Sequence, residues 1–222
     1  MDKKDVKRRR MWQYFIEATA AIIEEEGYDH ITIRKIADKA GYNSATIYNY
    51  FSELSHLTFF ASMRFLKPYT SAFINTIEDN KSIIEQYLNG WECFCEFSYQ
   101  NPRLFHTIFL MNIREEPKDL FKQYYDLYEA DIVEFPNSLK PALYERNVAI
   151  RGESLLKAAA DKGEIPQSKV KTISTMTTLI WQGMLTSILN RQTSLTSNEA
   201  KQETMISIRN VVYHAHLFET IT

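Results

Sequence analysis

Residues 31–51, ITIRKIADKAGYNSATIYNYF, restrict the fold more than any other stretch, because two short helical patterns flank a single glycine. In the first pattern, apolar side chains three or four residues apart would line one helix face: Ile33, Ile36, Ala37 and Ala40. Thr32 occupies the N-cap position of this helix, and its hydroxyl can accept a free backbone N–H. Gly41 readily adopts the positive φ that ends such a helix.

The second helical pattern can be capped by Asn43 or Ser44. Its inner face would hold Ile47, Tyr50 and Phe51. Two helices of this length joined by a glycine turn form a helix-turn-helix, which places its second helix in the major groove of DNA. The alternative is a helical hairpin with ordinary packing and no nucleic-acid partner.

The same segment resembles the TetR (tetracycline-repressor-like) family of bacterial transcriptional regulators, whose pattern runs roughly T-x-x-x-IA-x-x-AG-V-S-x-GT-L-Y-x-H/Y-F-x-x-K-x-x-L. The matching residues are Thr32, Ile36, Ala37, Ala40, Gly41, Thr46, Tyr48, Phe51 and Leu57. The preceding Glu25-Glu26-Gly27-Tyr28 also looks like the end of that family's first helix. The resemblance covers about the first quarter of the chain and implies a three-helix DNA-binding domain followed by a larger helical domain.

Three residues depart from the family pattern. Asn43 replaces the usual Ser and is an equally good cap, and Ala45 replaces the usual Gly and favours a helix. Leu54 stands where the family usually has Lys, so one phosphate contact that the resemblance implies is missing. This last change bears on DNA affinity more than on the fold.

Candidate DNA-contacting residues lie on both helices of the motif. Exposed positions that could meet base edges are Asn43, Ser44, Ala45 and Asn49. Asn can pair bidentately with adenine, and a small Ala can meet a thymine methyl. The resemblance implies phosphate contacts through the hydroxyls of Thr46, Tyr48 and Tyr50, and Arg34 and Lys35 are further phosphate candidates. The alternative for each residue is exposure to water, and for Tyr50 it is packing beneath Phe51.

Basic residues crowd the start of the chain, where Asp2 and Asp5 oppose Lys3, Lys4, Lys7, Arg8, Arg9 and Arg10. The whole chain has a net charge of −2 and a pI of about 6.2, so its composition gives no general attraction to DNA. A local basic cluster beside a helix-turn-helix can still contact phosphates, which fix the register of the protein on the duplex. The alternative is a solvated tail.

Hydrophobic residues make up 45% and charged residues 24% of the chain, as in ordinary soluble globular proteins. No apolar run reaches the roughly 18 residues of a membrane span, and the charged N-terminus lacks the apolar core of a signal peptide, so we expect a cytoplasmic location. Cys93 and Cys95 would point to different sides of a helix, which argues against a disulfide or a metal site. We expect no cofactor and no enzymatic activity, because no catalytic motif is present.

The rest of the chain is helical in pattern, without strand-like alternation, so the predicted class is all-α. Helices are expected over about 5–26, 81–100, 102–112, 117–136, 140–162, 168–192 and 197–219. A helix that resumes near Leu57 should kink or stop near Lys67, because Pro68 removes a backbone donor and clashes with the preceding turn. The expected domains are a DNA-binding domain over 1–52 and a ligand-binding and dimerisation domain over 53–222.

The last two predicted helices each carry an apolar stripe. One consists of Ile173, Met176, Ile180, Met184 and Ile188, and the other of Ile208, Val211, Val212, Ala215 and Phe218. Periodicity alone favours an intramolecular core for both stripes. The resemblance, however, implies a homodimer through these helices, here residues 168–219. A dimer also suits two DNA half-sites about one helical turn, roughly 34–36 Å, apart.

Aromatic residues are dense between residues 81 and 185. Such residues at helical spacing are more often core than pocket, but the resemblance implies a small-molecule pocket in this half of the chain. The candidate lining residues are Trp91, Phe94, Tyr125, Tyr128 and Trp181, with His106 or Gln182 as polar anchors.

The resemblance as a whole implies a homodimeric repressor that a small-molecule effector releases from its double-stranded DNA operator. Three alternatives stay open at this point: a small all-helical enzyme, a helix-turn-helix regulator controlled by a protein partner, and an activator. The residues name neither the effector nor the operator.

Overall fold

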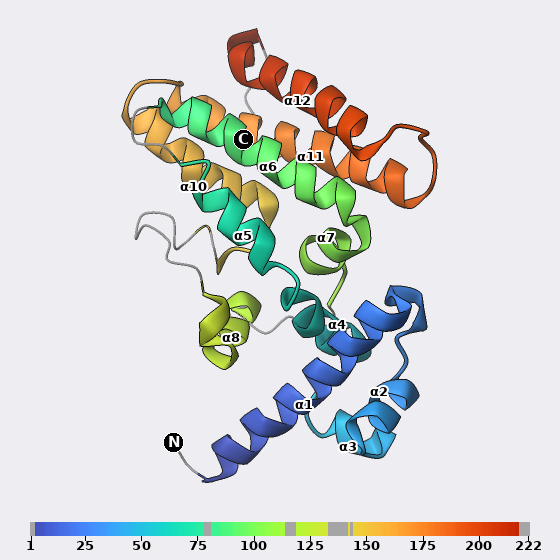
Figure 1. Cartoon of the computed structure of the whole chain (residues 1–222). Coiled ribbons are helices and arrows are strands. Elements are labelled where there is room, and N and C mark those ends of the chain that lie inside the picture. The colour runs from blue at the N-terminus through green and yellow to red at the C-terminus, as the bar shows by residue number, and fades with distance from the viewer. Residues whose placement is uncertain (1–2, 78–80, 114–118, 133–141, 143, 218–222) are drawn as a thin grey trace. The chain divides into compact units, whose positions relative to one another are not determined.

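The computed structural model describes residues 3–77, 81–113, 119–132, 142 and 144–217. Regular secondary structure in these ranges is entirely helical, which confirms the all-α class (Figure 1). The main helices are α1 (Lys3–Glu26), α2 (Ile33–Ala40), α3 (Ser44–Tyr48), α4 (Leu54–Met63), α5 (Lys67–Ile74), α6 (Ile83–Gln100), α7 (Pro102–Phe109), α8 (Leu120–Leu127), α10 (Val148–Asp161), α11 (Val170–Leu189) and α12 (Ser197–Tyr213).

Contacts along the chain define two compact units. The first unit combines residues 1–67 with residues 106–132, and the second combines residues 68–105 with residues 133–222. The predicted functional boundary at residue 52 falls inside the first unit, and it stays a prediction about where DNA binding resides. The structure adds that a segment from the middle of the sequence shares the N-terminal unit.

The first unit is built around α1, which packs against α2 and α4 (Figure 1). The inward side chains of α1 repeat at helical spacing, and Phe15 and Ile16 are fully buried. Trp12 lies between two other rings, with centroids 4.8 Å from Phe51 and 5.1 Å from Phe60. This aromatic cluster holds the chain after α3, and α4 itself, against α1.

Acidic residues at the end of α1 form ion pairs with lysines of α2. Lys35 Nζ lies 2.5 Å from Glu26 Oε2, and Lys39 Nζ lies 2.6 Å from Glu25 Oε2. The hydrogen bond from Lys35 lowers the pKa of Glu26. Carboxylates are unfavourable at the negative end of a helix dipole, and the two lysines offset that repulsion. The pairs therefore hold α2 beside the C-terminal end of α1.

Helix α8 belongs to the first unit although it is distant from α4 in sequence. The rings of Phe59 and Phe121 lie 5.7 Å apart, and those of Phe60 and Tyr124 lie 6.5 Å apart. Arg64, which caps the end of α4, forms an ion pair with Asp131 in the short helix η2 (Glu129–Asp131) after α8. Apolar contacts and an ion pair thus attach residues 119–132 to the N-terminal helices.

The second unit is organised around α6, with α10, α11 and α12 packed against it (Figure 1). Helix α6 begins with a capping box, in which Ser82 Oγ accepts from the Glu85 N–H and the Glu85 carboxylate accepts from the Ser82 N–H. Trp181 of α11 is fully buried, with its ring centroid 4.8 Å from that of Phe94. Its indole Nε1 donates to Ser98 Oγ at 2.9 Å, so this buried donor has a hydrogen-bond partner.

Pro68 does not kink a long helix. Helix α4 ends at Met63, and Pro68 lies in the first turn of the separate helix α5. A proline in a first turn removes no intrahelical hydrogen bond, which explains why it is accommodated there. The helix therefore ends several residues before the position predicted from Pro68.

Several other helices are shorter than their predicted ranges; α12, for example, ends at Tyr213 rather than near residue 219, and α8 and α10 differ as follows. Helix α8 ends at Leu127, because Tyr128 has φ −126° and ψ 67° and leaves the helical region. Pro117 and Pro136, the expected ends of this helix, lie outside the described residues. Helix α10 begins at Val148 rather than near residue 140, because Asn147 Oδ1 accepts from two backbone N–H groups and caps the helix there.

Candidate nucleic-acid interface and ligand cavity

The turn between α2 and α3 has the geometry that its sequence predicts. Thr32 caps α2, with its hydroxyl accepting from the Lys35 N–H at 3.2 Å. Gly41 ends the helix with φ 74° and ψ 30°, in the left-handed region. Of the two candidate caps for α3, Asn43 performs the role, because its Oδ1 accepts from the Thr46 N–H at 2.9 Å. These local bonds fix the angle at which α3 leaves the turn.

The centre of the inner face of the helix pair is buried. Ile36 is 0% exposed, and Ile47 and Phe51 are each 1% exposed. Tyr50, which was also predicted to lie on the inner face, is half-buried, and its ring centroid lies 5.9 Å from that of Phe15. Helix α3 is short, so this burial rather than helix propensity holds it in place.

The outer face of the pair presents a large aromatic residue beside small polar ones. Tyr48 is 57% exposed, and Asn43, Ala45 and Asn49 are exposed around it. A tyrosine ring left this open on a capped and packed helix is positioned for a partner rather than for the core. The exposed groups offer hydroxyl and amide hydrogen-bonding atoms and one methyl group.

The remaining predicted contact residues differ in how far they are already engaged. Thr46 Oγ1 donates to Asn43 Oδ1 at 2.9 Å, so a base contact by Asn43 would fall to its amide nitrogen. Ser44 is half-buried, Arg34 is exposed, and Lys35 forms the ion pair with Glu26. Lys35 could reach a phosphate only by exchanging that carboxylate for it.

The basic residues at the start of the chain lie on α1, which begins at Lys3, rather than on a tail. The Arg8 guanidinium carbon lies 5.8 Å from the centre of the Trp12 ring, within the range of a cation–π contact. Arg9 lies 3.9 Å from Glu129 of η2. The basic side chains therefore project from a helix, and some of them already face α8 and η2.

His56 is a buried ionisable group that the sequence reasoning did not single out. It is 6% exposed, and its ring lies 5.1 Å from Phe60 and 5.8 Å from Phe51. Burial lowers the pKa of His56, against a smaller opposite effect of Glu53. The available signal was its place directly before the mostly apolar run Leu57-Thr58-Phe59-Phe60. Leu54, in place of the family lysine, opens α4 and is half-buried.

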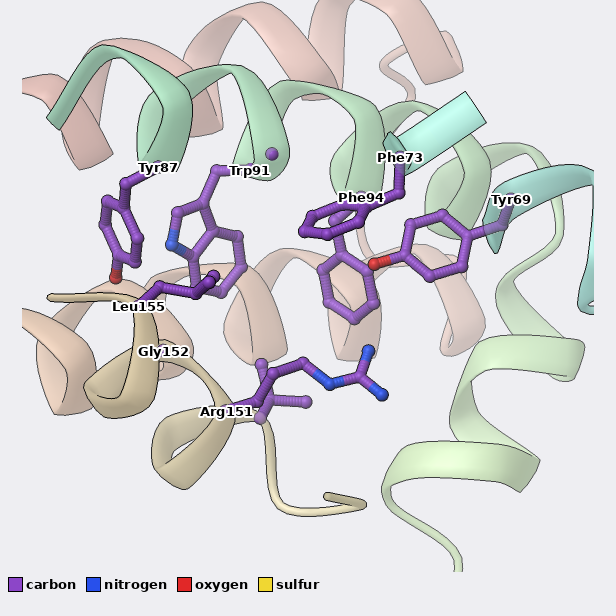
Figure 2. Close-up of a pocket in the computed structure, with 10 residues that line it drawn as sticks. Tyr69, Phe73, Tyr87, Trp91, Phe94, Arg151, Gly152 and Leu155 are labelled. Carbon is purple, nitrogen blue, oxygen red and sulfur yellow. The ribbon is translucent and has the colours of Figure 1, made fainter. Parts of the chain in front are cut away.

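The second unit contains a cavity between α5, α6 and α10 (Figure 2). Its volume is about 40 Å³, and its lining residues are Tyr69, Phe73, Tyr87, Gly90, Trp91, Phe94, Val148, Arg151, Gly152 and Leu155. Aromatic rings make up one wall, and residues of α10 make up the other (Figure 2). Burial raises the pKa of Tyr87 to about 12, so its hydroxyl stays protonated.

The predicted pocket residues lie in several places. Trp91 and Phe94 line the cavity, and Trp181 is buried behind Phe94. Tyr125 and Tyr128 belong to the first unit. His106 is exposed on α7 and Gln182 is half-buried on α11. The structure thus brings two of the predicted residues to this cavity, and it adds Tyr69, Phe73 and Arg151, which sequence reasoning missed.

The capped helix pair, its packed inner face and its open outer face define a helix-turn-helix domain. Residues 15–53, which span most of α1 through the start of α4, match the family model for "Bacterial regulatory proteins, tetR family". This match to the helix-turn-helix segment confirms the resemblance to the TetR family that the sequence predicted.

Curated relatives include an HTH-type transcriptional regulator from Staphylococcus aureus strain bovine RF122. It is 27% identical over 135 residues, which cover 58% of this chain and 72% of that protein. A regulator of the same description from strain USA300 has the same identity and coverage. No helix in the described part of the chain is long and apolar enough to cross a membrane.

Solved structures share the fold over nearly the whole chain. FadR from Thermus thermophilus, a TetR-family transcriptional repressor in complex with lauroyl-CoA, has a TM-score of 0.59 at 11% identity, covering 95% of this chain and 97% of that chain. FadR from Bacillus subtilis, in complex with stearoyl-CoA, has a TM-score of 0.54 at 16% identity, covering 90% and 97%. At these identities the likeness concerns the fold.

Proposed function

We propose that this regulator is a homodimeric repressor that binds operator DNA through α3 and leaves it when a small-molecule effector binds the second unit. The observation that carries this proposal is the open outer face of α3, with Tyr48 57% exposed on a helix that is otherwise capped and buried. An exposed aromatic side chain on a helix held in place by capping and packing is suited to contacts in the major groove of DNA.

Recognition would divide between base edges and phosphates. Asn49, Ala45 and the amide nitrogen of Asn43 would meet base edges, where Asn favours adenine and Ala favours a thymine methyl. Hydroxyls of Tyr48 and Thr46 would donate to phosphates and set the register. Ser44 and Tyr50, both half-buried, and Arg34 and Lys35 of α2 complete the proposed contact surface.

The exposed faces of α11 and α12 support a homodimer. Leu179 is 61% exposed on α11, and Ile206 and Tyr213 are 62% and 55% exposed on α12. The stripe of Ile208, Val211, Val212 and Ala215 is buried within its own unit, and Phe218 lies outside the described residues. A second copy would cover the open faces and would place two recognition helices at one DNA turn.

Release from DNA would follow a shift between two conformations of the dimer. The effector needs only to bind the non-binding conformation better, and typical coupling free energies are about 1–3 kcal/mol. The cavity between α5, α6 and α10 supports a small-molecule effector over a protein partner, because it is lined by side chains inside the unit. An activator would have the same chemistry, and the position of the operator relative to the promoter distinguishes the two.

The test uses DNA from upstream of the gene in an electrophoretic shift assay. The ligand-free protein should bind it, and Tyr48→Ala should weaken binding at least about tenfold while leaving the melting temperature unchanged, because the lost side chain is mostly in water. The matched control is Tyr14→Ala, since Tyr14 is 52% exposed on α1 of the same unit. Equal DNA binding by Tyr48→Ala and Tyr14→Ala would refute the role of α3.

A further inference from the structure

We propose that the first turns of α1 form a second DNA-binding surface, which holds the phosphate backbone beside the groove that α3 enters and supplies most of the electrostatic affinity for DNA. This inference rests on the proposed function, because the partner is the same operator duplex. It adds a surface outside the helix-turn-helix, which we call the basic face of α1 and define as Lys4, Lys7 and Arg8. Three observations support it: the charge of the motif, the charge of α1 and the side of α1 on which this face lies.

The helix-turn-helix itself carries little positive charge. Residues 31–57 contain three basic and two acidic residues, a net charge of +1: Arg34, Lys35, Lys39, Asp38 and Glu53. Two of these cations already form ion pairs, Lys35 with Glu26 and Lys39 with Glu25. Non-specific affinity for DNA comes almost entirely from cations that neutralise phosphates and release counter-ions. The motif therefore offers hydrogen-bonding groups that can read bases but few charges that can hold the backbone.

The first turns of α1 have the opposite character. Residues 3–10 contain six basic residues and one acidic residue, a net charge of +5 on little more than two helical turns. Five of the six basic side chains are exposed: Lys3, Lys4, Lys7, Arg8 and Arg10. Arg9 is half-buried and lies 3.9 Å from Glu129, so it is not part of the basic face. Duplex DNA, with roughly one negative charge per 1.7 Å of its axis, is the partner whose charge density matches this surface.

The basic face continues the side of α1 that packs against α3. On that side, the ring centroid of Phe15 lies 5.9 Å from that of Tyr50, and Met11, one turn earlier, is 8% exposed. The three residues of the basic face lie three, four and seven positions before Met11, and such positions share one side of a helix. Figure 1 shows α1 continuing beyond α3 in this direction. The side that is apolar where α1 meets α3 therefore becomes basic where α1 extends past it.

Ring contacts connect one member of the basic face to the end of the recognition motif. The Arg8 guanidinium carbon lies 5.8 Å from the centre of the Trp12 ring, and that ring lies 4.8 Å from Phe51, which follows α3. Asp5 and Asp126 line the same open groove as Arg8, so two carboxylates compete with a phosphate for this guanidinium. The two lysines of the basic face are not among the residues that line the groove. We therefore expect the lysines to contribute the larger share of phosphate binding.

The composition of these turns favours DNA over an anionic lipid surface. A helix that lies on a membrane needs a wide apolar face beside its charges, and Val6 is the only apolar residue in 3–10. Contacts with phosphates carry no sequence information, so the basic face would bind any duplex. It would hold the protein on DNA while α3 selects the operator.

The experiment measures how strongly salt weakens DNA binding by the full chain. Fluorescence anisotropy is recorded with a labelled duplex from upstream of the gene and with a random-sequence duplex of equal length, between about 50 and 200 mM KCl. In Lys4→Gln/Lys7→Gln/Arg8→Gln, the slope of log K against log salt should become shallower by about 3 for each bound protomer, one unit per lost phosphate contact. Affinity for both duplexes should fall by a similar factor, so the preference for upstream DNA should not change.

Two control variants separate a local contact from a general effect of charge. Lys157→Gln/Lys162→Gln/Lys171→Gln removes the same charge from exposed positions of the second unit and should leave the slope unchanged. Lys4→Arg/Lys7→Arg keeps the charges of the basic face and should keep its slope. If the first triple variant loses helicity in circular dichroism, Lys4→Gln/Lys7→Gln alone should still make the slope shallower by about 2 per protomer, because both side chains are exposed.

Three results would overturn the inference: an unchanged slope in the variant of the basic face, an equal change in the variant of the second unit, or binding of phosphatidylglycerol vesicles in place of either duplex. An unchanged slope together with weaker DNA binding by Tyr48→Ala removes only the basic face. A shallower slope without any preference for upstream DNA removes the proposed function, and binding to neither duplex removes both.

Discussion

Removal of the Asp131 carboxylate should destabilise the first unit, because this group compensates a largely buried arginine. The Arg64 and Asp131 side chains are 28% and 16% exposed, and the Tyr124 hydroxyl also donates to Asp131. The Arg64 guanidinium carbon lies 4.3 Å from the centre of the Tyr128 ring. Arg64 Nε lies 3.0 Å from Glu17, an ion pair without hydrogen-bond geometry. Burial acts to lower the pKa of Arg64, but Tyr124, Glu17 and Asp131 outweigh it and raise that pKa.

The size of the effect follows from how exposed the pair is. Breaking a fully buried ion pair costs about 3–5 kcal/mol, and a surface pair contributes about 0–1 kcal/mol. Arg64 lies between these limits and keeps Glu17, so Asp131→Ala should lower the free energy of unfolding by about 2 kcal/mol. Asp131→Asn keeps an acceptor for Tyr124 and should lose about half as much. In a chain of this length, about 2 kcal/mol corresponds to a fall in melting temperature of roughly 4–8 °C.

Calorimetry gives the melting temperature, and amide hydrogen exchange over residues 119–132 shows whether α8 and η2 loosen before the rest of the unit. The control is Asp126→Ala, an exposed carboxylate on α8, the helix that precedes η2. If the free energies of unfolding of Asp131→Ala and Asp126→Ala differ by less than about 0.5 kcal/mol, the ion pair stabilises the unit no more than a surface pair does, and the reasoning is refuted.

Two further predictions concern the buried histidine and the exposed faces of the last helices. Burial lowers the pKa of His56 in the folded chain, so protonation of this residue favours unfolding. The free energy of unfolding should therefore fall as pH drops below about 6.5. Urea unfolding at pH 7.5 and 5.5 should show a smaller loss of this free energy for His56→Phe than for the unaltered protein. Ile206→Asp should yield a monomer in light scattering, with helicity unchanged in circular dichroism. Ser207→Asp, exposed about 100° away around the same helix, should remain a dimer, and a dimeric Ile206→Asp would count against the proposed interface.

The helix-turn-helix was predictable because its signals are local. Thr32 and Asn43 cap the two helices and Gly41 turns the chain, and each acts on backbone atoms within a few residues. The spacing of Ile36, Ile47 and Phe51 identified the inner face for the same reason. The sequence therefore predicted the exposed face of α3. It did not predict which exposed groups contact DNA, because that depends on the DNA that binds.

The cavity was less predictable, because it depends on which aromatic residues meet across the fold. Trp91 and Tyr128 were both predicted to line a pocket. Trp91 does line the cavity, whereas the Tyr128 ring stacks on Arg64 in the first unit. Arg151 has the spacing of an ordinary solvated residue on α10, and no local pattern places it beside Phe94. Aromatic density predicted a well-packed interior but not its division between the two units.

The division of the chain changes how a signal from the cavity can travel. The sequence predicted a single domain boundary, at residues 52–53, but the chain passes between the two compact units at 67–68, 105–106 and 132–133. Residues 106–132 leave the second unit after α6 and return before α10, the two helices that supply opposite walls of the cavity. Within the first unit, the ion pair between Arg64 and Asp131 ties the end of this segment to α4. In the proposed function, a conformational signal from ligand to DNA therefore has three chain connections available, where the sequence predicted one.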